Sequence, residues 1–148
     1  MKANNFIALF GVFLSLFAFN SSAEQKSLVL TVQVKGANSD RGQVLVSLFS
    51  SSEHYLKVPQ SKKSMPIDSE GAAKLVFNNL DAGRYAVSVI YDENSDGELN
   101  TGFLGIPKES VGFSNNVEAR FGPPSFDKAA FELLTSTKMV IELKSVKH

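Results

Sequence analysis

The sequence predicts an all-β fold, an antiparallel β-sandwich of six or seven short strands with one long loop flap. Three observations support this prediction. Apolar residues alternate with polar ones at a period of two in several segments, and turn-forming residues separate these segments at regular intervals. No long stretch has the apolar spacing of an amphipathic, capped helix. The chain of 148 residues is long enough for one such domain.

The first two strands are expected to form a hairpin. Residues 28–34 place Leu or Val at every second position, and residues 44–48 resume this alternation after the turn-rich segment 36–42. Residues 50–67 are polar and include two prolines, so we expect a loop there, with a short helical turn over 53–57.

Later strands are expected at residues 73–77, 85–91, 131–133 and 139–143. Asp81 precedes Tyr85 by four residues, which is the spacing of a tyrosine corner, in which the phenol bonds to upstream backbone. Gly83 would supply the positive φ of that turn. The alternative is that Tyr85 is simply an inward-facing strand residue.

The N-terminus predicts export. Lys2 precedes an apolar run from Phe6 to Phe19, and Ser21-Ser22-Ala23 places small residues at a cleavage site after Ala23. The run of 14 residues is shorter than the about 20 that a membrane-spanning helix needs, and no later segment is apolar enough to span. We therefore expect a cleaved signal peptide over 1–23, a single mature domain over 24–148, and a periplasmic or secreted location.

Composition excludes several classes of function. The 15 basic and 15 acidic residues balance, so the chain lacks the positive charge of a nucleic-acid-binding protein. The absence of cysteine excludes disulfides and thiolate chemistry. His54 and His148 lie in a polar loop and at the chain end, so we assign no catalytic residue and expect no enzyme activity.

The segment after Tyr91 resembles the first half of a calcium loop. Asp92, Asn94 and Asp96 occupy positions 1, 3 and 5, Gly97 occupies position 6, and the carbonyl of Glu98 would be the ligand at position 7. Alternate side chains in a tight loop converge on one point, and calcium prefers such oxygen ligands.

The second half of this segment does not match the calcium loop of an EF-hand. Position 12 is Phe103, where an EF-hand has its bidentate Glu, so a completing ligand would have to come from Asn100, Glu109 or Asp127. The alternative is a polar hairpin loop whose side chains bond their own backbone. Calcium is the only cofactor that the sequence suggests.

A stretch of about 30 residues follows in which aromatic residues alternate with Gly, Pro and Asn. It could contact a ligand such as a sugar or a peptide, or it could form a flap whose Phe side chains plug the end of the sandwich. The candidate contact residues are Phe103, Phe113, Asn115, Asn116, Phe121 and Phe126. We expect this flap to lie over the same end of the molecule as the Asp92 loop.

Three segments together resemble the DUF2141 family. They are Leu80–Val89 with Gly83 and Tyr85, the run Asp92–Leu99, and the run from Gly105-Ile106-Pro107 through Gly112-Phe113-Ser114-Asn115-Asn116 to Gly122-Pro123-Pro124-Ser125-Phe126. The resemblance covers almost all of the mature chain. It implies a small exported bacterial protein with an immunoglobulin-like or prealbumin-like sandwich. The family has no known activity, ligand or catalytic residue that could be assigned to this chain.

The resulting hypothesis is an exported binding or accessory module, monomeric, calcium-stabilised and without catalysis, whose partner is an envelope protein or a glycan. One alternative is an exported carbohydrate-active or other hydrolytic enzyme that uses two of the carboxylates of Asp92, Asp96, Glu109 and Asp127. The other is a structural component of the envelope.

Overall fold

The computed structural model describes residues 27–145, which form eight strands and very little helix. The predicted signal peptide lies outside these described residues, as does His148. The strands are β1 (Leu28–Lys35), β2 (Gln43–Phe49), β3 (Ser61–Pro66), β4 (Ala73–Leu80), β5 (Gly83–Asp92), β6 (Val111–Phe113), β7 (Phe131–Leu133) and β8 (Thr137–Glu142). The short helical segments are η1 (Phe103–Gly105), η2 (Ser114–Asn116) and α1 (Phe126–Ala129).

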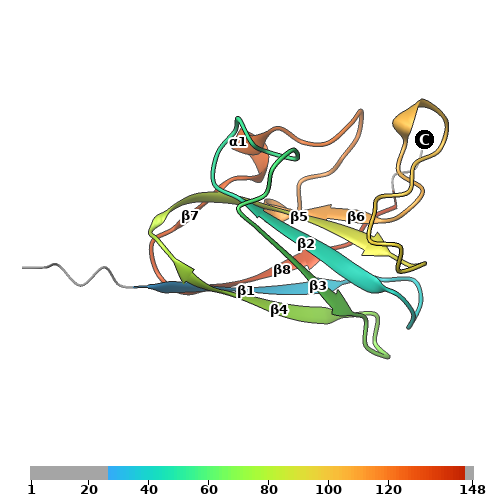
Figure 1. Cartoon of the computed structure of the whole chain (residues 1–148), viewed down its shortest axis with the longest axis horizontal. Helices are drawn as coiled ribbons and strands as arrows, with labels where there is room; N and C mark the ends of the chain where they lie inside the picture. The colour runs from blue at the N-terminus through green and yellow to red at the C-terminus, as the bar shows by residue number, and fades with distance from the viewer. Residues whose placement is uncertain (1–26, 146–148) are drawn as a thin grey trace, which may run out of the picture.

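The strands form the two layers of a β-sandwich, as predicted (Figure 1). One sheet has the order β4-β1-β8 and the other has the order β3-β2-β5-β6, with β7 also paired to β5. All pairs are antiparallel except β1 and β8, which run parallel. This parallel pair brings the last strand back beside the first one.

The predicted hairpin of the first two strands is wrong. β1 pairs with β4 and β8, whereas β2 pairs with β3 and β5 in the opposite sheet. The alternation in each strand correctly predicts that one face of the strand is buried. It does not show which strand lies alongside, and the link 36–42 is long enough to cross between the sheets.

The predicted loop over 50–67 contains a strand, β3. Its residues are almost all exposed, because β3 is the edge strand of its sheet and pairs only with β2. An edge strand held by backbone hydrogen bonds needs no apolar pattern, so β3 left no such signal in the sequence. Residues 52–57 form turns, with a hydrogen bond from the Val58 amide to the His54 carbonyl.

The core lies between the sheets. Alternate residues of β1 and β5 point into it. The two tyrosines of β5 also bond through their hydroxyls to backbone carbonyls outside the strand. Tyr85 donates to the Asp81 carbonyl at 3.0 Å, which confirms the tyrosine corner. Tyr91 donates to the Arg41 carbonyl at 2.8 Å. The positive φ predicted for Gly83 is wrong. The residue with positive φ near this turn is Asn79 (φ 57°), which lies in β4.

A second, smaller apolar cluster covers the outer face of the β2–β5 sheet. It consists of Phe49, Tyr55, Ala86, Phe126 and Ala129. The rings of Phe49 and Phe126 both contact Tyr55 edge-on, with centroids 5.2 and 5.7 Å from it. The Tyr55 hydroxyl is buried without a hydrogen-bond partner, and burial raises the pKa of Tyr55 to about 12.

Residues 114–130 leave the sheet after β6 and return to it at β7. Their two ends are held together by side chains: the Ser114 hydroxyl donates to the Ala129 carbonyl at 2.5 Å, and the Asn115 amide donates to the Ala130 carbonyl at 2.9 Å. Ser114 also accepts the Val87 amide of β5 at 2.9 Å. Segment 114–130 is therefore a closed loop that is anchored on β5.

Candidate functional site

The candidate site is the loop 93–110 between β5 and β6, and its anchor is Asp92. This last residue of β5 is fully buried. Its carboxylate accepts the Asp96 amide at 3.1 Å, the Gly97 amide at 2.9 Å and the Gln43 side-chain amide at 2.8 Å. Three N–H donors therefore hold the buried carboxyl group at the base of the loop.

The next polar side chains repeat one pattern, in which each accepts the backbone amide two residues further on. The Asn94 oxygen accepts the Asp96 amide at 3.3 Å, and the Asp96 carboxylate accepts the Glu98 amide at 2.9 Å. Gly97 has φ +84°, which permits the bend at position 6 that was expected there. The loop thus winds around the side chains at positions 1, 3 and 5.

The ring of side chains is closed by Asn100 and Glu109. The Asn100 amide group donates to Asp96 at 2.9 Å, and the Asn100 backbone amide donates to the Glu109 carboxylate at 2.8 Å. Of the three candidates for a completing ligand, the structure therefore brings Asn100 and Glu109 to the loop. It does not bring Asp127, which lies on α1 and forms an ion pair with Arg84 at 2.9 Å.

The side-chain NH2 group of Asn94 points at two oxygens of its neighbours. It donates to Asp96 at 2.8 Å and to the Asn100 oxygen at 3.0 Å. Hydrogen bonds from Asn100, from the Glu98 backbone and from Asn94 lower the pKa of Asp96, so this exposed carboxylate is charged at neutral pH. The arrangement offers oxygen ligands of the kind that calcium takes. Across residues 27–145, no group of three or more His, Cys, Asp or Glu residues converges as a metal site. A cation here would therefore depend on amide and carbonyl oxygens as well.

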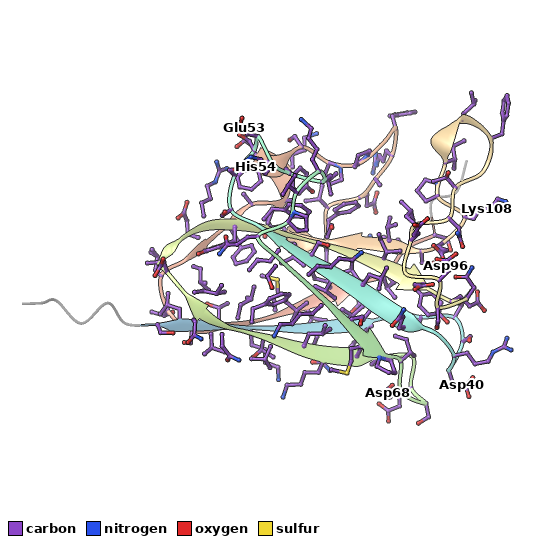
Figure 2. The ribbon with its side chains drawn as sticks, viewed as in Figure 1. Asp40, Glu53, His54, Asp68, Asp96 and Lys108 are labelled. Carbon is purple, nitrogen blue, oxygen red and sulfur yellow. The ribbon has the colours of Figure 1, made fainter. Side chains whose placement is uncertain are left out.

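The outer half of the loop is a small hairpin with an apolar tip. The Gly102 amide donates to the Ile106 carbonyl at 2.7 Å, and the Lys108 amide donates to the Asn100 carbonyl at 2.9 Å. At the tip, in η1, Phe103 is 87% exposed and Leu104 is 80% exposed. In Figure 2, Asp96 and Lys108 mark this loop at the right of the view, whereas His54 lies at the top.

The predicted single flap over the Asp92 end is wrong, because its aromatic residues are distributed over four places. Phe103 lies at the exposed tip just described, Phe113 is a buried residue of β6, and Phe126 packs on Tyr55 in the outer cluster. Phe121 is fully exposed in the segment between η2 and α1. Turn residues bracket all four alike, so the sequence did not show which ones would pack.

The two predicted contact amides are engaged with backbone. Asn115 holds the ends of segment 114–130 together, as described above. The Asn116 side chain accepts the Glu142 amide at 2.9 Å and donates to the Val140 carbonyl at 3.2 Å, and so binds the edge of β8. Both residues have positive φ, which Asn tolerates better than most residues.

Sequence reasoning missed Gln43, which donates to Asp92, and Gly42 beside it. A Cβ on Gly42 would lie 2.5 Å from the Asp92 carbonyl oxygen, so only glycine allows β2 to approach the loop base this closely. Both contacts follow from the pairing of β2 with β5, in which Gln43 lies opposite Asp92. Because that pairing was not predicted, neither residue could be found.

A separate pocket of about 360 Å³ lies where the edge strands β3 and β4 meet. It is lined by Gln60, Ser61, Lys63, Phe77, Asn78, Asn79 and Leu80. The lining contains no carboxylate, so this pocket lacks the paired acids of a glycosidase site.

Comparison with known proteins identifies the family. Residues 32–142 match the model of a family described as an uncharacterized protein conserved in bacteria (DUF2141). The chain belongs to the DUF2141 family. No curated protein and no solved structure matches the chain. The DUF2141 match spans both sheets and the whole 93–110 loop, so the candidate site lies inside the family domain. Between residues 27 and 145 there is no helix long and apolar enough to cross a membrane.

Proposed function

We propose that this DUF2141 protein is an exported, non-catalytic binding module in which calcium stabilises the loop 93–110. The observation that carries the proposal is the closed ring of oxygen-bearing side chains built on Asp92. The proposed ligands are the side chains of Asp92, Asn94, Asp96, Asn100 and Glu109, with the carbonyl of Glu98.

The hydrogen bonds within the loop support this proposal. The carboxylate at position 1 is held in one orientation, because Asp92 accepts the backbone amides of positions 5 and 6. The carboxylate missing from position 12 has a substitute in Glu109, which reaches Asn100 from the other side of the loop. The Asn94 amide, which donates to oxygens of two neighbours, would turn so that its own oxygen faces the ion.

Export is proposed from the apolar run and small-residue site at residues 1–23. It would place the domain where calcium is available to sites that bind it at about 10⁻⁴–10⁻³ M. Mass spectrometry of the protein recovered from the cell envelope and the culture medium tests this part. A first residue at Glu24 is expected, and an intact Met1 would contradict it.

Thermal unfolding with added calcium tests the metal site. At 10–100 times its dissociation constant, calcium would stabilise the folded state by about 1.4–2.7 kcal/mol. For a domain of this size that corresponds to a rise of roughly 5–10 °C in Tm. Magnesium should raise Tm much less, because it needs a smaller octahedral site and keeps its water ligands.

Two alanine variants form a matched pair for this test. Asp96→Ala removes a proposed side-chain ligand, and Glu98→Ala removes the same charge from a residue that would ligate only through its carbonyl. We expect Asp96→Ala to abolish the calcium response and Glu98→Ala to keep most of it. If millimolar calcium leaves the Tm of the unaltered protein unchanged, and also that of Asp96→Ala, the loop is a polar turn and the proposal is wrong.

A further inference from the structure

The apolar tip of the 93–110 loop has a geometry that none of the preceding functions uses. Phe103 and Leu104 are adjacent, and both are more than three-quarters exposed. They stand at the end of a hairpin and not in a groove, and Figure 1 shows the η1 segment projecting beyond the sheets. Exposed apolar residues that cluster on a surface commonly mark an interaction site.

We propose that this tip docks on the surface of a phospholipid bilayer, and that calcium in the loop below it is required. This inference rests on the calcium site of the proposed function and names what that site would regulate.

The backbone of the hairpin suits entry into a lipid interface. Polar backbone groups that enter the bilayer without partners are costly. Here the Gly102 and Gly105 amides donate within the turn, at 2.7 and 3.3 Å, and Thr101 forms a bridge with Pro107. The tip can therefore bury two large apolar side chains while its turn keeps its own hydrogen bonds.

The shape of the tip argues against a second copy of this chain as the partner. A protruding Phe-Leu pair needs an apolar recess of matching size. The pocket between β3 and β4 is lined mostly by amide, hydroxyl and ammonium groups, and its Phe77 is almost completely buried. A soft lipid interface accepts a convex apolar tip without a preformed recess.

The charge of the loop explains why calcium is required. Residues 92–110 contain five acidic residues and one basic residue, Lys108, giving a formal charge of −4. An anionic bilayer would repel this loop, and a bound divalent cation removes half of that charge. Asn100 and Glu109 lie on either side of the hairpin stem, so an ion bound by both would also fix the tip relative to the sheet.

Vesicle sedimentation tests the proposal, with vesicles made of equal parts of phosphatidylglycerol and phosphatidylethanolamine. The protein is the form recovered from the envelope, and calcium is added or chelated. We expect calcium to raise the bound fraction on these anionic vesicles about tenfold or more. Binding to pure phosphatidylcholine vesicles, which do not repel the loop, should depend less on calcium.

The variant Phe103→Ser/Leu104→Ser should lose vesicle binding and keep both its Tm and its calcium response. Leu134→Ser is the matched control, because Leu134 is 69% exposed and follows Leu133, which pairs with Gly83 at the opposite end of β5 from Asp92. It should bind vesicles like the unaltered protein. Asp96→Ala should lose both the calcium response and vesicle binding.

The possible failures are distinguishable. If calcium raises Tm but the vesicles bind no protein, or bind the tip variant equally well, the docking proposal is wrong and the calcium site stands. If calcium leaves Tm unchanged, the proposed function is wrong. If the anionic vesicles bind the protein equally well without calcium, the proposal that calcium acts by reducing the negative charge of the loop is wrong. Tip-dependent binding to an envelope protein without vesicle binding would replace the lipid by a protein partner.

Discussion

The segments on the two sides of β6 have similar compositions and opposite structures. Residues 93–110 and 114–130 both combine Phe with Gly, Asn and Pro. The first uses its polar side chains to fold around a common centre and exposes Phe103 at its tip. The second uses Ser114 and Asn115 to close its ends and buries Phe126 against the sheet. The second segment also exposes Phe121, so exposure of a Phe ring does not separate the two. They differ in what their polar side chains hold together, which is a loop folded on itself in the first segment and the two ends of a closed loop on the sheet in the second.

The largest expected effect comes from shortening one Phe side chain in each segment. Phe126→Ala should destabilise the domain by about 3 kcal/mol or more, because it removes a buried ring from the outer cluster. Phe103→Ala should change the free energy of unfolding by less than about 0.5 kcal/mol. Urea denaturation measures both values. Similar losses in the two variants would show that the tip also packs against the fold.

The next effect concerns the base of the first segment. Asp92→Ala should cost about 2–3 kcal/mol, because it leaves the amides of Asp96, Gly97 and Gln43 without their buried acceptor. Hydrogen exchange should show faster exchange of the Asp96 and Gly97 amides, while the amides of β1 stay protected. If the two loop amides remain protected, Asp92 does not hold the loop.

The same contrast shows what the sequence could and could not predict. Alternation in β1 and β5 predicted the buried face of each sheet, because burial on one side requires a period of two. The Asp92 loop was predictable because its contacts join residues two to nine positions apart. The partners of β1, the strand β3 and the separate positions of Phe103 and Phe126 depend on contacts between distant segments, and a local pattern does not contain them.

Two tyrosine variants should change stability by smaller amounts and in opposite directions. Tyr85→Phe removes the hydrogen bond to the Asp81 carbonyl and should cost about 1 kcal/mol. Tyr55→Phe removes a buried hydroxyl without a partner, next to Phe126, and should stabilise the domain by up to about 1 kcal/mol. Thermal and urea unfolding of the two variants give the signs. A loss in Tyr55→Phe would show that this hydroxyl has a partner in solution.

The smallest effect is the response of the two segments to acid. Each holds one exposed carboxylate whose pKa is lowered in the folded state. Asp96 is bonded to Asn100, the Glu98 amide and Asn94, and Glu118 is paired with Lys144 and Arg120. The ordinary pKa values are 3.8 and 4.5, so in the acid range the unfolded chain binds more protons than the folded one. The stability from both groups is present above these values and is lost as the pH falls below them.

Asp96→Asn and Glu118→Gln should therefore each make stability less dependent on pH between about 5 and 3. Because Asp96 is also a proposed ligand, calcium should shift the acid transition to lower pH in the unaltered protein and in Glu118→Gln, and should shift it less in Asp96→Asn. Unfolding monitored by circular dichroism at several pH values, with and without calcium, measures these changes. An equal calcium effect in Asp96→Asn would mean that the ion acts elsewhere, and the functional difference between the two segments would then need another explanation.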